Sequence, residues 1–520
     1  MRIEQFAANS ALRHPEKVAL VEGDSRYRYR QINCAAIGVA HLLRKHGLKR
    51  GDRVVIFSEN SAEAVVAIFG TLYAGGVFSP VSPGTKSDKL AFILNNCRAE
   101  VIVTHSKLLP IVTQVLERCP TVKTCLVTDG EPSPAGAVRI PDILSWPTAN
   151  PAAGPMEPGI DIDLAMLIYT SGSTGFPKGV MMTHQNIVHA STSITTYLEN
   201  TPSDIILSVL PISFDYGLYQ VLMTFQIGMT LVLEKSFTYP QVVLNKMIKE
   251  QATGFPVVPT IAAILLQMGS LKPDMFPSLR YITNTAAALP PAHIQRLQGL
   301  FPSARLFSMY GLTECKRCTY LSPEQLATRP GSVGKAIPNS EAWVINEAGE
   351  ICKPNEVGEL VIRGGHVMKG YWENPQATDH CLKPNARYPW EKELRTGDLF
   401  RTDEEGYLYF VGRKDDILKT RGEKVSPKEV ENILYMLEGV KEAAVVGVPD
   451  AILGMAIKAV IVLAEGISLN AQEIIRHCAG HLEDFMVPKF VEFRAELPKT
   501  TTGKIRRSEV QAQELAQSGL

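Results

Sequence analysis

The chain has 520 residues, of which 45% are hydrophobic and 20% are charged. A chain of this length and composition is globular and too long for one ordinary domain, so we expect two or three domains. Lys+Arg and Asp+Glu number 53 each, and this balance gives no long-range field that would favour nucleic acid or an anionic membrane surface. Any anion site must therefore be local.

The first residues, Met1 to Gln5, include an acid and no apolar segment of the length of a secretory signal. The most apolar long stretch, residues 64–81, contains three glycines and a proline, so it fits a buried helix and strand better than a membrane span. The closest pair of the nine cysteines, Cys315 and Cys318, has no second pair and no suitably spaced histidine beside it. We therefore expect reduced thiols and a cytoplasmic location.

Helical patterns alternate with short β-branched segments from residue 15 to about 130 and again over residues 180–310. Helices are expected at 29–45 and 61–74, and strands at 53–57, 101–104, 164–169 and 305–308. Such alternation predicts a mostly parallel sheet with helices on both faces. Residues 131–160, dense in Pro, Gly and Ala, are expected to form a surface connection.

The pattern changes after residue 330. Short strands with turn residues between them recur over 331–410 and predict a small antiparallel or barrel-like subdomain. A helix at 427–436 and strands at 442–448 and 456–463 then suit a compact α+β domain. We place the boundary near Asp415, which divides the chain into domains of 1–414 and 415–520.

The most informative segment follows the strand at 164–169 and reads Thr170-Ser171-Gly172-Ser173-Thr174-Gly175-Phe176-Pro177-Lys178-Gly179. Its glycines let the backbone approach a ligand, its hydroxyls add donors, and Lys178 supplies a point charge. It differs from a Walker P-loop, because here the lysine precedes its glycine. The segment predicts a polyphosphate site.

This segment resembles the signature loop of the adenylate-forming, or AMP-binding, superfamily: AMP-forming acyl-CoA synthetases, luciferases and the adenylation domains of peptide synthetases. The resemblance extends from Tyr27 to Lys504, with several motifs in the family's order. It implies an α/β fold: a large N-terminal domain of layered αβαβα sheets with a small β-barrel-like subdomain, and a small mobile α+β C-terminal domain. It also implies an AMP-forming acid–thiol ligase that uses ATP and Mg²⁺.

The same resemblance assigns the nucleotide site. Tyr310 would stack on adenine, and Glu314 would hold magnesium together with Thr170, since a hard cation favours oxygen ligands. Asp398 would accept both ribose hydroxyls, with Arg413 donating to the same sugar. The residues expected at ATP or AMP are Thr170, Ser171, Gly172, Ser173, Thr174, Gly175, Lys178, Thr285, Ala286, Ala287, Tyr310, Gly311, Thr313, Asp398 and Arg413.

Lys504, near the C-terminus, would bind the substrate carboxylate and the α-phosphate and so offset the repulsion between these two anions. Glu314 and Thr170 complete the expected catalytic set. After adenylation, the C-terminal domain would rotate about Asp415. Gly422 would then lie beside the path of the pantetheine thiol of CoA or of a carrier protein.

The acid pocket is expected to include Phe214, Asp215, Tyr219, Asn284, Met309 and Arg317. A buried Asp215 needs a cation, either an amine on the substrate or a residue such as Arg317. The first case would give a stand-alone amino-acid adenylation enzyme that loads a carrier protein. The second would give an acyl-CoA ligase, or an enzyme that loads an acyl carrier, in fatty-acid or secondary metabolism. The amino-acid sequence of residues 419–427 resembles that of stand-alone acyl-CoA ligases more than that of modular enzymes. Together with the lack of a condensation region or carrier domain in the sequence, it favours the reading as an acyl-CoA ligase or acyl-carrier-loading enzyme.

Two further readings are weaker. A catalytically silent binding module would be expected to lose Lys504, Glu314 or Asp398, and all three are present. Luciferase-like oxidation would need a luminogenic substrate, which nothing in the sequence indicates.

Overall fold

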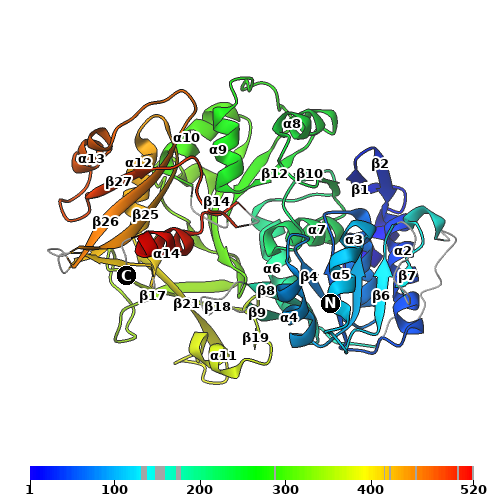
Figure 1. The fold of residues 1–520 in the computed structure, drawn as a ribbon. Helices are drawn as coiled ribbons and strands as arrows, with labels where there is room; N and C mark the ends of the chain where they lie inside the picture. Colours follow the sequence, from blue (N-terminus) through cyan, green and yellow to red (C-terminus); the bar gives the residue numbers. More distant parts are fainter. Residues whose placement is uncertain are drawn as a thin grey trace.

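The structure is a computed structural model. It describes residues 1–129, 137–146, 158–170, 177–285, 289–414, 416–420, 423–450, 454–500 and 503–517. Figure 1 shows the N-terminal segments, in blue and cyan, on one side of the molecule and the C-terminal segments, in orange and red, on the other. Among the described residues, no helix is long and apolar enough to cross a membrane.

One sheet of the N-terminal part has eight strands among the described residues. In spatial order these are β19 (Gly370–Tyr371), β9 (Lys178–Thr183), β8 (Leu164–Thr170), β4 (Val77–Val81), β3 (Arg53–Phe57), β5 (Ala99–Thr104), β6 (Thr124–Val127) and β7 (Ala137–Arg139). The strands from β8 to β7 pair in parallel, whereas β8, β9 and β19 pair antiparallel. The expected mostly parallel sheet is therefore confirmed.

The second sheet has nine strands in the part of the chain that the structure describes. Their order is β16 (Lys335–Ala336), β15 (Lys316–Leu321), β14 (Arg305–Leu312), β13 (Tyr281–Asn284), β12 (Gly254–Val257), β10 (Ile205–Ser208), β11 (Thr230–Leu233), β1 (Val18–Glu22) and β2 (Ser25–Arg28). The six strands from β14 to β1 are parallel, and antiparallel strands close both edges.

Helices cover both sheets. They are α1 (Glu4–Arg13), α2 (Tyr29–Lys45), α3 (Ala62–Tyr73), α4 (Ser87–Asn96), α5 (Leu109–Leu116), α6 (His184–Tyr197), α7 (Asp215–Ile227), α8 (Pro240–Lys249), α9 (Pro259–Gln267), α10 (Pro291–Leu300) and α11 (Pro375–Cys381), with 3-10 turns at Ser106–Leu108, Ile143–Ser145 and Pro323–Gln325. The helix expected at 61–74 begins at Ala62, because the hydroxyl of Ser61 caps it by accepting from the Ala64 amide.

The layers follow from the alternation of side chains along each strand. Val54 and Ile56 of β3 point into an apolar cluster shared with α2, α3, α6, α7 and the second sheet, whereas Val55 and Phe57 point to the opposite face, against α4 and α5. The far face of the second sheet packs on α8, α9 and α10. The result is the expected αβαβα layering.

The remaining elements form two smaller units. An antiparallel sheet contains β17 (Ser340–Ile345), β18 (Gly358–Gly364), β20 (Leu382–Pro384), β21 (Lys392–Thr402) and β22 (Leu408–Arg413). The C-terminal unit contains β23 (Leu418–Thr420), β24 (Glu423–Val425), α12 (Pro427–Met436), β25 (Val440–Asp450), β26 (Gly454–Leu463), α13 (Ala471–Ala479), β27 (Phe490–Phe493) and α14 (Arg507–Gln517). It has its own apolar clusters, which agrees with the predicted α+β domain.

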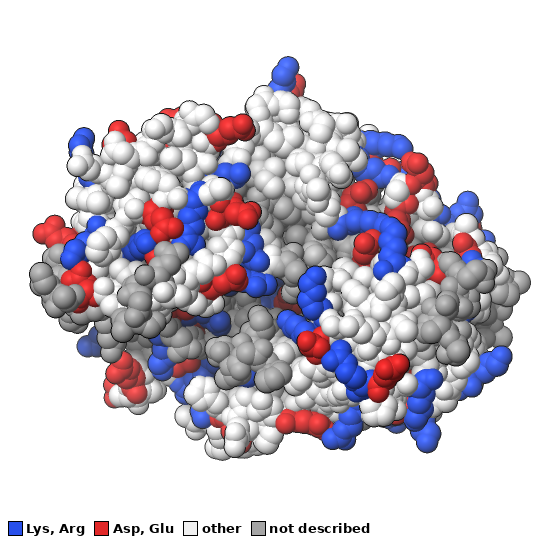
Figure 2. Space-filling view, in the orientation of Figure 1, with Lys and Arg blue, Asp and Glu red and all other residues white. Residues whose placement is uncertain are grey.

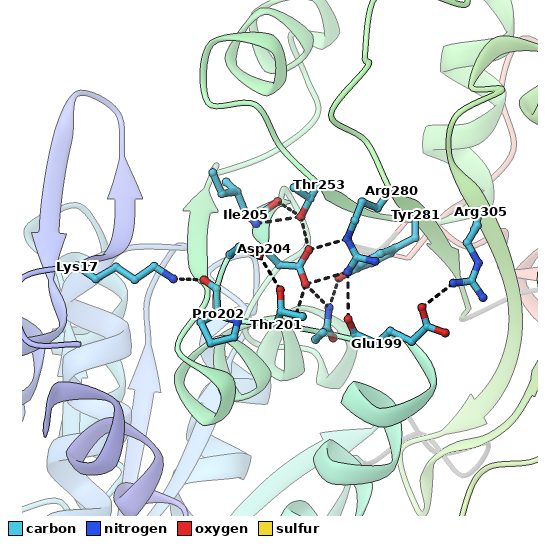
Figure 3. A network of polar contacts seen from close by, with 12 residues as sticks. Lys17, Glu199, Thr201, Pro202, Asp204, Ile205, Thr253, Arg280, Tyr281 and Arg305 are labelled. Atoms are coloured by element: carbon cyan, nitrogen blue, oxygen red, sulfur yellow. Dashed lines mark hydrogen bonds and ion pairs between the residues drawn. The ribbon is translucent and has the colours of Figure 1, made fainter. Parts of the chain in front are cut away.

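A buried polar network ties together the amino ends of the parallel strands β10, β12 and β13 (Figure 3). Asp204 is almost fully buried and receives two hydrogen bonds of 2.9 Å from Arg280. The Thr253 hydroxyl and the Thr201 amide also donate to it, at 2.7 and 2.8 Å. Because these residues stand just before or near the start of a strand, the network holds the amino ends of the parallel strands together. The carboxyl ends of the same strands are free of it.

Candidate functional site

The phosphate-loop motif begins and ends on a β-hairpin. Thr170 is the last residue of β8 and lies opposite Lys178, the first residue of β9. The predicted phosphate ligands Ser171 to Gly175 come between these two residues in the sequence and are outside the described residues. Four other predicted residues are also outside the described residues: Ala286, Ala287, Asp415 and Gly422. The structure thus places the two flanks of the loop side by side.

The side chains of Glu314 and Lys178 both lie against Tyr371, a residue that the sequence did not point to. The Tyr371 hydroxyl donates a 2.7 Å hydrogen bond to Glu314 Oε1, and Lys178 Nζ lies 5.3 Å from the centre of the same ring. Tyr371 is held there because β19 pairs with β9, and the Met368 amide donates to the Glu314 carbonyl at 2.8 Å. Burial raises the pKa of the Glu314 carboxyl, and the Tyr371 bond opposes this shift.

Tyr310, Asp398 and Arg413 form a second group. The Tyr310 hydroxyl donates to Asp398 Oδ2 at 2.6 Å, and Arg413 Nε donates to Oδ1 at 2.9 Å. Asp398 and Arg413 are directly opposite each other on β21 and β22, so strand register fixes the ion pair. The three residues predicted at adenosine are therefore in mutual contact.

Tyr310 and Gly311 belong to β14, which runs to Leu312, whereas the sequence analysis ended this strand at Ser308. Gly311 faces Arg317 at a register shift between β14 and β15. A Cβ added at Gly311 would lie 1.9 Å from the Lys316 carbonyl oxygen. The hairpin therefore requires glycine here, and Thr313 and Glu314 occupy its turn.

Lys504 belongs to the C-terminal unit, but its charge is close enough to interact with the Asp398–Arg413 pair of the large unit. The surrounding protein atoms and Arg413 lower the pKa of its ammonium, and Asp398 acts in the opposite direction, although the residue is exposed to solvent. The loop is seated by Gly503, which has φ +79° and whose added Cβ would lie 2.5 Å from the Thr260 hydroxyl of α9. Two units of the chain thus contribute to one site.

Figure 2 shows Lys and Arg side chains gathered around a hollow near the centre of one face. Among the described residues predicted to bind the nucleotide, the cations are Lys178, Arg413 and Lys504. Because the chain as a whole has no net charge, this concentration is local, as expected for a polyphosphate ligand.

At the start of α7, Asp215 forms an ion pair, and its partner is Lys316, whereas the sequence left open a substrate amine or a residue such as Arg317. Lys316 Nζ lies 2.9 Å from Asp215 Oδ2 and 4.2 Å from the centre of the Tyr219 ring. The Lys316 side chain is only 2% exposed, and burial lowers its pKa to about 7 against the opposing effect of Asp215. Lys316 and Arg317 are successive residues of β15, so their side chains point to opposite sides of the strand, and Lys316 has a left-handed backbone with φ +60°.

Arg317 has a different environment. Its guanidinium lies 4.5 Å from the centre of the Tyr216 ring, and Nη1 contacts Met309 Sδ at 3.5 Å. Arg317, Met309, Tyr219 and Asn284 are all fully buried, whereas Phe214 and Asp215 keep partial solvent access. Thr285 is buried next to Asn284 at the carboxyl end of β13. The predicted acid-pocket residues therefore lie together, with Phe214 and Asp215 nearest to solvent.

Two layered sheets, an antiparallel subdomain, and a C-terminal unit whose lysine interacts electrostatically with an Asp–Arg pair of the large unit are the architecture of an adenylate-forming ligase. The chain belongs to the AMP-binding enzyme family: the family's profile matches residues 7–372, and the profile of the AMP-binding enzyme C-terminal domain matches residues 429–504. It is an AMP-forming acid–thiol ligase, which activates a carboxylic acid with ATP and forms a thioester.

Known relatives cover nearly the whole chain. A long-chain-fatty-acid–CoA ligase of Bacillus subtilis (strain 168) is 32% identical over an alignment of 531 residues, gaps included, and this alignment covers 97% of this chain and 93% of the relative. The anthranilate CoA ligase AuaEII in complex with anthranoyl-AMP has a TM-score of 0.90 and 26% identity over 100% of this chain and 98% of that chain. ATP-bound MatB from Rhodopseudomonas palustris has a TM-score of 0.87 and 28% identity over 99% of both chains.

Sequence reasoning missed Lys316 and Tyr371. Lys316 stands two residues after Glu314 and beside Arg317, so adjacent cations could have been weighed equally against Asp215. Tyr371 carried no signal, since its role depends on the pairing of a two-residue strand with β9.

Proposed function

We propose that this chain joins a carboxylic acid without a charged ammonium group to the thiol of coenzyme A. The observation that carries the proposal is the Asp215–Lys316 ion pair, 2.9 Å long and shielded by Tyr219. Because Lys316 already neutralises Asp215, the carboxylate does not need a substrate ammonium as a counter-ion. This favours the acyl reading over amino-acid loading of a carrier protein.

The names of the relatives support a carboxylic acid as the substrate, but they do not define which acid this chain uses. One is named for long-chain fatty acids and another for anthranilate, so the family model and fold are compatible with very different acids. In this chain the partly exposed Phe214 and Asp215 would meet the acid first. An apolar ring beside an already paired carboxylate suits an acyl or aryl group better than a cation.

A magnesium ion fits the residues at the phosphate end. Glu314 and Thr170 offer the hard oxygen donors that Mg²⁺ prefers. Burial raises the pKa of the Glu314 carboxyl, and a divalent cation beside it would offset this cost. Bound there, the ion would neutralise charge on the phosphates of ATP.

In the adenylation step, this chain's residues act mainly by holding and neutralising charge. Asp398 and Arg413 would hold the ribose and Tyr310 the adenine ring. Lys504 would lie between the substrate carboxylate and the α-phosphate, where the lysine charge reduces the repulsion between two anions. Its placement near Asp398 and Arg413 corresponds to the arrangement that this step needs.

The thiol step would need Lys504 to leave. We place the hinge at Asp415, between a domain of 1–414 and one of 415–520, and Gly422 beside the thiol path. Rotation at such a hinge separates the two half-reactions, because the same site is first completed by the lysine and then opened to the thiol.

A basic pocket supports coenzyme A as the acceptor. Its volume is about 390 Å³, and it is lined by Glu359, His380, Lys383, Arg395, Gly397 and Lys414. Lys414 and Gly397 lie next to the Arg413–Asp398 pair in sequence. A surplus of cations beside the hinge suits the phosphates of a free nucleotide thiol, whereas a carrier protein offers a single phosphodiester.

The first test is ATP–pyrophosphate exchange against fatty, aryl, hydroxy, dicarboxylic, α-amino and β-amino acids. We expect exchange with acids that lack an amine. Exchange that depends on an amino acid would refute the proposal and make Asp215 an ammonium partner. Lys504→Ala should lower exchange about 100-fold or more, while Lys499→Ala in the same loop, whose side chain pairs with Glu442, should leave it unchanged.

The acceptor is tested separately. We expect Lys383→Ala and Lys414→Ala to raise the KM for coenzyme A and leave the KM for ATP unchanged. Lys392→Ala, an exposed lysine of β21 outside the pocket, is the matched control. Equal turnover with a phosphopantetheinylated carrier protein in wild type and variants, and none with coenzyme A, would favour a carrier instead.

A further inference from the structure

A buried group of two cysteines and a histidine stands behind the catalytic hairpin. One nitrogen of the His366 imidazole and the Sγ atoms of Cys315 and Cys318 all lie within 4.8 Å of one another. All three side chains are fully buried. Cys315 lies in the β14–β15 turn and Cys318 in β15, whereas His366 comes from the loop after β18. In the sequence, 47 residues lie between Cys318 and His366, which is why their spacing gave no signal.

His366 is oriented as a metal-binding histidine is. Its Nδ1 lies 3.2 Å from the Ser340 hydroxyl, and Nε2 is buried without a hydrogen-bond partner among the described residues. A second-shell group on one ring nitrogen fixes the tautomer that leaves the other nitrogen's lone pair available. The His189 ring stacks on the His366 ring, with their centroids 5.5 Å apart, and helps to fix its orientation.

The sulfur atoms of Cys315 and Cys318 are closer together than two sulfur atoms that are neither bonded to each other nor bound to one metal ion. Their Sγ atoms are 2.8 Å apart, between the covalent S–S length of about 2.05 Å and the separation of about 3.8 Å that two zinc-bound thiolates take. A disulfide would use both sulfurs but leave His366 Nε2 buried and unpaired, which costs free energy. A metal ion uses all three ligands, and this decides between the two readings.

We propose that Cys315, Cys318 and His366 form a structural site for a thiophilic divalent ion, zinc by preference. Two thiolates and one neutral imidazole are the ligand set that zinc selects over magnesium or calcium. Binding releases the two thiol protons to solvent, so the three ligands and the ion together carry no net charge. Three protein ligands leave one position of a tetrahedral ion to a non-protein ligand.

The site would hold the catalytic hairpin in place. Glu314 immediately precedes Cys315, and Lys316 stands between the two cysteines. The loop of His366 also contains Met368, whose amide donates to the Glu314 carbonyl, and leads to Tyr371. An ion shared by the hairpin and this loop would therefore fix both partners of the Glu314–Tyr371 hydrogen bond. It would act by position and would not touch the reacting atoms.

The test measures metal in the full-length, tag-free protein, purified without chelator, by inductively coupled plasma mass spectrometry. We expect about one zinc per chain, and its loss in Cys315→Ser, Cys318→Ser and His366→Ala. Cys97→Ser, at another fully buried cysteine with no such neighbours, should keep the zinc. Protein grown with Co²⁺ should show the near-ultraviolet absorption of cobalt bound to thiolate, which Cys318→Ser abolishes.

The wild-type protein alone can overturn the proposal, so a variant that fails to fold does not leave it open. Metal-free protein with nine titratable thiols after denaturation would refute it. So would peptide mapping that finds Cys315 joined to Cys318 in a disulfide. Neither result bears on the acid or the acceptor of the proposed function.

Discussion

Replacing Asp215 by Asn should destabilise the protein in a way that depends on pH. The change removes the counter-ion of Lys316, whose side chain is 2% exposed. Leaving a buried charge without its partner usually costs about 3–5 kcal/mol. Lys316 can avoid most of this cost, because its pKa is already about 7 and it can lose its proton.

The magnitude follows from the change in that pKa. If the loss of Asp215 lowers the pKa of Lys316 by one to two units, the stability lost is about 1.4 to 3 kcal/mol, at 1.36 kcal/mol per unit. Asp215 raises the lysine pKa relative to the variant, so this full contribution is present only below the pKa of Lys316 in the variant, falls to about 1 to 1.4 kcal/mol near pH 6, and is lost as the pH rises through about 7. Above that value both proteins hold a neutral Lys316.

Thermal and urea unfolding at about pH 6 and about pH 8.5 measure this difference. We expect a clear loss of stability near pH 6 and a small one near pH 8.5. In a Lys316→Met background the same Asp215→Asn change should lose its pH dependence, and Asp274→Asn, at an exposed position, should have no effect. An equal loss at both pH values would refute the assignment of Lys316 as the partner that titrates.

Three other outcomes are expected. Gly311→Ala should fold poorly or lose nucleotide binding, since its Cβ would lie 1.9 Å from a carbonyl oxygen of the facing strand; circular dichroism and ATP binding would show it, and normal behaviour of both would contradict it. Tyr371→Phe removes the 2.7 Å hydrogen bond to Glu314 and should raise the magnesium concentration needed for half-maximal pyrophosphate exchange, with little change in melting temperature. Arg280→Met leaves Asp204 with fewer donors and should cost about 2–3 kcal/mol of stability without changing the KM for ATP; a KM shift with unchanged stability would count against a purely structural network.

The layered fold was predictable because its signals are local. The helix at 29–45 and the strand at 53–57 have the predicted bounds, since runs of apolar residues with periods of 3.6 and 2 decide such elements. β14 extends further than predicted because Gly311 allows the strand to continue into the hairpin. That choice depends on β15, which a short window of sequence does not contain.

For the site, the sequence allowed a set of residues to be proposed but not their partners. Asp398 and Arg413 meet through strand register, and their joint spacing pointed to them. Which of the neighbouring cations Lys316 and Arg317 faces Asp215 depends on where β15 begins and on its register with β14, since successive side chains of a strand point to opposite sides. A short window of sequence does not determine that register.

The contact at Gly503 lets the lysine-bearing loop leave the large unit without withdrawing a side chain from a pocket. The loop rests on Thr260 through a residue that has no side chain, so its departure leaves no empty socket at this point. The ring contact between His293 and Tyr435 must also break if the C-terminal unit turns. A bulkier residue at position 503 would wedge the loop away from α9, and the enzyme would be locked out of its first half-reaction while remaining competent for the second.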